Sequence, residues 1–196
     1  PYTISVQVTD DPWPADFWAN DPLLGGGHVI SQGVHGTDLL HFLAGSEPPS
    51  VFAAGANYHQ PTRVMDHLSA VFRFANNTAG AFLATDSGRP PGIGKFLVQV
   101  FGKEGSAVLA DRLTRLSFRD PQTGRQIEYN GDEDGFMEEN RAFVRWLHGE
   151  TVAVPSVRDG CIAQAMIDTA IRSAHEGVAL PINLFPDKGR LDGVRQ

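Results

Sequence analysis

The chain has 196 residues, a length that fits one large domain or two small ones. Hydrophobic residues make up 41% of it and charged residues 20%, which is typical of a globular protein and excludes a disordered chain. The 16 Lys and Arg residues are scattered and outnumbered by 23 Asp and Glu residues. The resulting net charge of −7 argues against binding to nucleic acid or to an anionic membrane surface.

A single cysteine, Cys161, excludes an intrachain disulfide framework and cysteine-rich zinc or iron–sulfur sites. It lies on the apolar side of a predicted helix, where we expect a small buried side chain. The composition is compatible with a reducing cytoplasm, the location that we expect. No apolar run approaches the ~20 residues of a membrane-spanning helix, and no signal peptide is visible. Because the chain opens on a strand pattern without an initiator Met, we expect a fragment cut at a domain boundary.

The first third of the chain is predicted to contain one strand, one loop and one helix. Apolar and polar residues alternate over residues 3–9, the period of a half-buried strand. An aromatic-bearing loop over residues 16–24 ends in three consecutive glycines. Residues 28–44 are predicted as a helix because apolar residues recur at steps of three to five, although Gly33 and Gly36 each cost about 1 kcal/mol relative to Ala.

Strands dominate the middle of the chain, and helices return in the last third. The predicted strands cover residues 51–58, 67–74, 79–85, 96–101, 107–110, 115–119, 126–129 and, near the end, 181–185. Helices are predicted over residues 134–148 and 156–176, the second opening with Ser156 and Asp159 at capping-box spacing. We expect one domain over residues 1–185, followed by a flexible tail over residues 186–196.

This order of elements predicts an α+β fold, in which a long and mostly antiparallel sheet carries its helices on one face. The other face of such a sheet is left open to solvent. Several of the predicted strands have few charges on either face. We therefore expect a second copy of the chain to cover the open face, giving a homo-oligomer.

The densest group of candidate site residues follows the glycine triplet. In a helix Ser31, His35 and Asp38 fall at i, i+4 and i+7 and share one face, where a histidine beside a hydroxyl and a carboxylate can relay a proton. Gly26 and Gly27 would let a ligand approach the backbone and the first N–H groups of the helix. The competing interpretation is that His35 packs or caps the core and that Asp38 is a solvated charge.

The same segment carries a resemblance to a known family. Residues 25–45 resemble the substrate-domain signature of the Gfo/Idh/MocA oxidoreductases through Gly25, Gly26, Gly27, Gly33, His35, Asp38, Leu39, Leu40, Leu43 and Gly45. The resemblance continues in order through a central hairpin at residues 67–87, a Gly-x-x-Gly-Ser turn at residues 102–106 and two closing helices. It covers nearly the whole chain and is more specific for the family than for a substrate.

The resemblance implies a substrate-binding domain whose partner, an absent N-terminal Rossmann domain, holds NAD or NADP. It implies that His35 is the catalytic histidine, taking the hydroxyl proton of a small-molecule substrate as hydride moves to nicotinamide. Trp18, Ser31, Asp38, Gly26 and Gly27 are then expected to line the substrate site. Ser31 stands where the family has an Asp, and a serine can bind a hydroxyl but is no anionic base at pH 7.

The sequence thus predicts the substrate domain of a dehydrogenase acting on a sugar, polyol or cyclic diol, inactive as an isolated fragment. The alternatives are a non-catalytic sugar-binding or regulatory member of the family and a structural module without a site. We expect no metal ion, because His35, Asp38 and His41 drift around the helix. His59 and His67 flank a proline-containing loop that could line the cleft, and loop surface is the favoured interpretation.

Overall fold

The structure, a computed structural model, describes residues 1–131 and 135–184. The described residues form one nine-stranded sheet in the order β8-β7-β6-β5-β1-β4-β3-β2-β9. The strands are β1 (Thr3–Thr9), β2 (Ser50–Ala56), β3 (His67–Arg73), β4 (Ala79–Thr85), β5 (Phe96–Gly102), β6 (Gly105–Ala110), β7 (Arg115–Arg119), β8 (Gln126–Asn130) and β9 (Leu180–Pro181). The helices are η1 (Trp18–Asn20), α1 (His28–Ser31), α2 (Gly33–Ala44), α3 (Gly135–Leu147) and α4 (Val157–Glu176).

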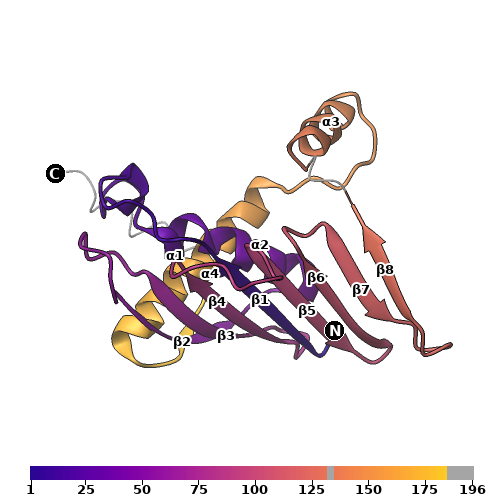
Figure 1. The fold of residues 1–196 in the computed structure, drawn as a ribbon, viewed down its shortest axis with the longest axis horizontal. Helices are drawn as coiled ribbons and strands as arrows, with labels where there is room; N and C mark the ends of the chain where they lie inside the picture. Colours follow the sequence, from indigo (N-terminus) through magenta and orange to yellow (C-terminus); the bar gives the residue numbers. More distant parts are fainter. Residues whose placement is uncertain (132–134, 185–196) are drawn as a thin grey trace.

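The predicted α+β fold with an open sheet is confirmed, with one difference in topology. Strands β2 to β4 and β5 to β8 form two antiparallel meanders, and β1 lies between them (Figure 1). β1 pairs parallel with β4 and antiparallel with β5. The sheet is therefore mixed. The first strand of the chain lies at its centre, where both edges of β1 are hydrogen-bonded and its apolar residues are wholly buried.

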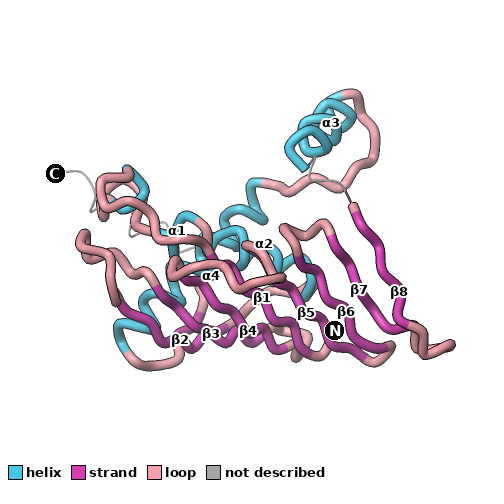
Figure 2. Tube along the Cα trace, in the orientation of Figure 1, coloured by secondary structure: helices cyan, strands magenta, loops and turns pink. Residues whose placement is uncertain are grey.

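The core lies between one face of the sheet and the helices α1, α2 and α4 (Figure 2). Val6 and Phe82 from the sheet meet Leu40 of α2 and Met166 of α4 in this layer. α4 begins with the predicted capping box, in which Ser156 and Asp159 each bind the other's backbone N–H, and ends at Gly177 in the left-handed region. The burial of this layer holds α2 in a defined position on the sheet.

Helix α3 does not pack on the sheet, contrary to the prediction of two closing helices. It lies away from the sheet, and none of its described residues is buried (Figure 1). Its exposed side chains include Phe136 and Trp146. The pattern of α3 is amphipathic, so its sequence forms a helix, but within the described structure no element covers its apolar face.

Two smaller predictions also needed correction. Cys161 is exposed rather than buried, because it lies on the solvent side of α4 while Ile162 and Met166 face the core. The final strand β9 has two residues instead of five. The predicted tail over residues 186–196 and the end of that strand at Phe185 lie outside the described residues. None of the described helices is long and apolar enough to cross a membrane.

The sheet face opposite the helices is open, as predicted. Side chains that alternate with the core positions emerge there, and they include Phe52 (49% exposed), Val71 (56%) and Phe101 (45%). These three come from β2, β3 and β5 and lie between small or polar neighbours. Whether a second copy of the chain covers this face stays a prediction.

Candidate functional site

The predicted helix over residues 28–44 is present but broken at Gln32. α1 ends at Ser31, α2 begins at Gly33, and Gln32 has φ −105° and ψ −29° between them. Gly33 and Gly36 lie where the helix packs against neighbouring side chains and leaves no room for a Cβ atom. A Cβ atom at Gly36 would lie 2.5 Å from Cε2 of Phe82 and 2.7 Å from Cγ2 of Val8. The glycines therefore let α2 lie directly on β1 and β4.

This close packing presents His35 to solvent. His35 is exposed, whereas Ser31 and Asp38 are half-buried. Among the described residues these three side chains form no hydrogen bonds with one another, so the predicted relay is not closed by direct contacts. Asp38 interacts electrostatically with His41 and His35, while burial raises the pKa of its carboxyl. The interpretation of His35 as a core residue is therefore wrong.

Asp38 also faces a cavity between α2 and the segment before α4. The cavity has a volume of about 550 Å³. His41, Pro155 and Asp159 line it together with Asp38. His35 is not among the lining residues, so Asp38 lies between the exposed imidazole and this cavity.

Gly26 and Gly27 have a structural role that does not require a ligand. Their φ angles are +69° and +90°, a region that favours glycine. The N–H of Gly27 donates to the carbonyl of Ala19 at 2.7 Å, and that of Gly26 donates to Asp21 at 2.9 Å. Both N–H groups are thus used within the chain. A substrate-binding role for these glycines stays a prediction.

Trp18 lies on η1 and is 59% exposed, with its ring 5.6 Å from that of Phe17. It is therefore accessible to a ring-shaped ligand. Trp13 packs instead edge-on against His28 at 5.3 Å.

The buried imidazole of this region belongs to His28, the first residue of α1. Its side chain is wholly buried, and neither ring nitrogen has a hydrogen-bond partner. Burial lowers the pKa of His28 to about 4, against the opposing effect of the Asp86 and Asp10 charges. His28 is therefore neutral at physiological pH.

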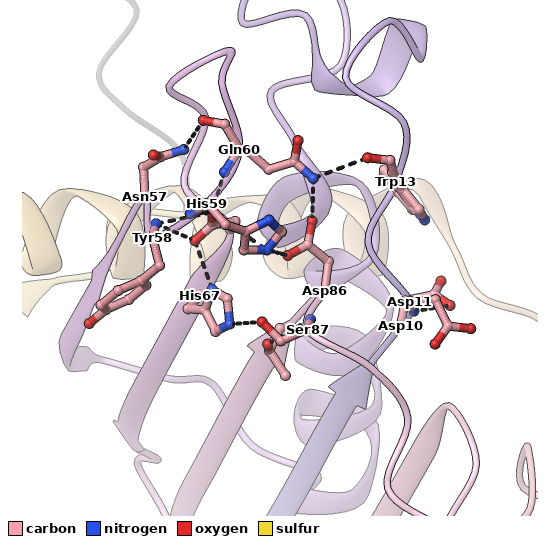
Figure 3. A network of polar contacts seen from close by, with 12 residues as sticks. Asp10, Asp11, Trp13, Asn57, Tyr58, His59, Gln60, His67, Asp86 and Ser87 are labelled. Carbon is pink, nitrogen blue, oxygen red and sulfur yellow. Dashed lines mark hydrogen bonds and ion pairs between the residues drawn. The ribbon is translucent and has the colours of Figure 1, made fainter.

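A second polar group, not expected from the sequence, lies where β3 begins and β4 ends. It consists of His59, Asp66, His67 and Asp86, whose nitrogen and oxygen ligand atoms lie within 4.8 Å of one another (Figure 3). Nε2 of His59 is 2.6 Å from Asp86, and Nδ1 of His67 is 2.7 Å from Asp66. His59 lies in an exposed loop, as predicted, whereas His67 is the half-buried first residue of β3 and not part of the loop. Asp86 is distant from His59 and His67 in the sequence, so no local motif indicated that these side chains meet.

Asp66 is the anchor of this His–Asp cluster. Burial by itself would raise the pKa of Asp66. Hydrogen bonds from His67 and from the backbone N–H groups of His59, Gln60 and Tyr58 outweigh that effect and lower it to about 2. The carboxylate therefore stays ionised throughout the physiological range. It holds the loop between β2 and β3 in place.

Comparison with known proteins identifies the fold. Residues 1–184 match the model of the Gfo/Idh/MocA oxidoreductase family, C-terminal alpha/beta domain. The chain belongs to this family. No curated protein is similar enough in sequence to count as a match.

Three solved structures of this fold share 14% to 21% sequence identity with the present Gfo/Idh/MocA domain. The aldose–aldose oxidoreductase from Caulobacter crescentus, solved with glycerol, has a TM-score of 0.77 and 17% identity over 91% of this chain and 55% of that one. Levoglucosan dehydrogenase, solved with NADH and levoglucosan, has a TM-score of 0.78 and 21% identity over 93% and 59%. A super-repressor mutant of Gal80p from Saccharomyces cerevisiae has a TM-score of 0.75 and 14% identity over 92% and 57%. The chain thus spans somewhat more than half the length of these proteins.

Proposed function

We propose that this domain binds the substrate in an oxidoreductase that transfers hydride between NAD or NADP and a hydroxyl group of a sugar, polyol or cyclic diol. The observation that carries the proposal is the exposed imidazole of His35, presented by a helix that packs tightly on the sheet. Histidine is the side chain that most often serves as a general base, so an exposed imidazole is suited to accept a hydroxyl proton. Membership of an oxidoreductase family gives that proton transfer its chemical context.

The cofactor would be held mainly by another part of a longer protein. In the described residues no glycine-rich turn links a strand to a helix in a βαβ unit, since β1 leads into an irregular loop. The exposed His35 and the half-buried hydroxyl of Ser31 nevertheless suit a reaction at a surface that such a part covers. When bound, nicotinamide supplies the hydride acceptor or donor.

In this proposal some residues of the chain bind the substrate and others take part in proton transfer. His35 takes the hydroxyl proton as hydride leaves the adjacent carbon. The hydroxyl of Ser31 binds a substrate hydroxyl but does not act as an anionic base. Asp38 attracts the positive charge that His35 carries after it has taken the proton. Trp18 offers an exposed ring face for stacking.

The test uses the longer protein that includes this domain, assayed with NAD and with NADP against a panel of polyols and sugars. We expect His35→Ala to lower kcat by about 10²- to 10⁴-fold. Ser31→Ala is expected to act mainly on KM. His175→Gln, which changes an exposed histidine of α4, serves as the control. Unchanged turnover in His35→Ala would refute the assignment.

The second candidate is a non-catalytic sugar-binding or regulatory protein, and Ser31 favours it because no carboxylate stands at that position. Ligand binding measured by calorimetry, without hydride transfer to either nicotinamide, would support this candidate over the enzyme.

We also propose a homo-oligomer formed through the open sheet face, on the evidence of its exposed Phe52, Val71 and Phe101. A cytoplasmic location is proposed on the composition.

A further inference from the structure

We propose that His59, Asp66, His67 and Asp86 bind a divalent transition-metal ion such as Zn²⁺. Two imidazoles and two carboxylates form a donor set that suits this class of ion. Their ligand atoms lie within 4.8 Å of one another (Figure 3). The inference is separate from the proposed hydride-transfer function, because it uses none of the residues assigned to substrate.

The sheet itself brings the four residues together. His67 is the first residue of β3 and pairs with Thr85 at the end of β4, which places Asp86 next to it. His59 comes from the loop between β2 and β3, and Asp66 closes that loop. Three of the four positions are therefore set by strand register, and the fourth is set by the loop bonded to Asp66.

Each carboxylate is oriented by neighbours that leave an oxygen facing an imidazole. Oδ2 of Asp66 accepts the backbone N–H groups of Tyr58, His59 and Gln60 at 3.0, 2.8 and 2.9 Å. Its Oδ1 lies 2.7 Å from Nδ1 of His67 and also accepts the backbone N–H of Tyr58 at 2.8 Å. Oδ2 of Asp86 accepts from Nε2 of Gln60 at 2.8 Å, while its Oδ1 lies 2.6 Å from Nε2 of His59. Such outer bonds are typical of metal ligands.

Metal binding would require a change of tautomer at His67. Its Nδ1–H donates to the ionised Asp66, and this proton must be released when Nδ1 binds an ion. Its Nε2 lies 2.5 Å from Oγ of Ser87, a hydroxyl that can accept the N–H of the metal-bound tautomer. With His59 coordinating through Nε2, each of the four side chains offers one ligand atom, and these atoms lie within 4.8 Å of one another. Their present N–O separations of 2.6 and 2.7 Å are those of hydrogen bonds. Ligands of a tetrahedral zinc ion stand about 3.4 Å apart, so each pair must open by about 0.7 Å.

Charge and access also favour an ion of charge +2. Asp66 and Asp86 are wholly buried, and the ion pairs described for them are with the two imidazoles. A divalent ion would neutralise both carboxylates without requiring either histidine to be protonated. The side chains of His59 and His67 are 34% and 25% exposed, which gives the ion a route from solvent. Four protein ligands leave no open position, as in structural zinc sites.

The test is metal titration of the chelator-treated 196-residue chain with Zn²⁺ and, as a spectroscopic probe, Co²⁺. We expect one ion per chain, a visible Co²⁺ absorption band of tetrahedral type, and a rise in Tm of about 5 to 10 °C at 100-fold excess over Kd. His67→Gln and Asp86→Asn are expected to weaken binding at least tenfold. His175→Gln, an exposed histidine on α4, should bind like the unchanged chain.

Folding of each variant is checked by circular dichroism in chelator. Because Asp86 is buried and its substitution can impair folding, His59→Gln provides the tolerant variant at a side chain that is one-third exposed. Loss of the Co²⁺ band in folded His59→Gln supports the site. Absence of stoichiometric binding, or equal binding by His59→Gln and the unchanged chain, overturns it and leaves the cluster as a hydrogen-bonded clamp.

Discussion

The substitution Gly36→Ala tests whether the helix that presents His35 lies directly on the sheet. The added Cβ would lie 2.5 Å from a ring carbon of Phe82 and 2.7 Å from a methyl group of Val8. Both side chains are in the core, with Phe82 3% exposed and Val8 wholly buried, so neither can turn into solvent. We therefore expect the helix to move away from β1 and β4 or the core to be strained.

The expected change in the free energy of unfolding combines two opposing effects. Overpacking of a buried site costs about 1 to 3 kcal/mol, and these contacts are at the severe end of that range. Alanine regains about 1 kcal/mol over glycine within a helix. The net expectation for Gly36→Ala is a loss of about 1 to 2 kcal/mol in the free energy of unfolding, or a fall in Tm of roughly 2 to 8 °C.

Gly160→Ala is the matched control. Gly160 also lies within a helix, in the first turns of α4, and its added Cβ would meet nothing within 4 Å. Only the helix preference then acts, so we expect Gly160→Ala to raise stability by about 0.5 to 1 kcal/mol. Both variants are measured by urea unfolding followed by circular dichroism. If Gly36→Ala is as stable as the unchanged chain, the close packing of α2 on β1 and β4 is wrong.

Two further predictions concern pH and assembly. His28 has a folded-state pKa of about 4 against about 6.5 when unfolded. The unfolded chain therefore binds the proton first, and up to about 3 kcal/mol of stability is lost as pH falls from about 6.5 to 4. Urea unfolding across this range should show a smaller loss in His28→Leu than in the control His175→Gln, and equal losses would contradict the assignment. In light scattering after size-exclusion chromatography, Val71→Asp on the open sheet face should reduce the mass to that of one chain. Val178→Asp, at a similarly exposed valine after α4, should leave the oligomer intact, and an oligomer that survives Val71→Asp would exclude this face.

Local patterns were sufficient for most of the elements. The strands at residues 79–85 and 115–119 match the prediction to the residue. The first is bounded by turn residues, and the second alternates polar and apolar residues, which are signals carried by neighbouring positions. The turn between β3 and β4 was also predictable, since Asn77 adopts φ +66° and asparagine tolerates that region. The capping box of α4 depends on residues only three apart, so it too was visible in the sequence.

The candidate site was only partly predictable. The sequence indicated His35 through spacing along one helix, and the structure places that imidazole at the surface. The same spacing could not indicate that Gln32 interrupts the helix or that His28 is the buried histidine. Burial of His28 depends on Trp13 and on the sheet beneath it, which are brought there by the tertiary fold.

The sequence by itself determined the local elements, the α+β class and the candidate histidine, because each depends on residue types within one turn or one strand. Only the tertiary structure decided that β1 lies at the centre of the sheet, that α3 lies apart from it, and that Asp86 meets His59 from 27 positions away. Pairing between distant segments depends on how burial and hydrogen bonds are satisfied across the whole chain. Local periodicity therefore cannot predict which distant segments pair.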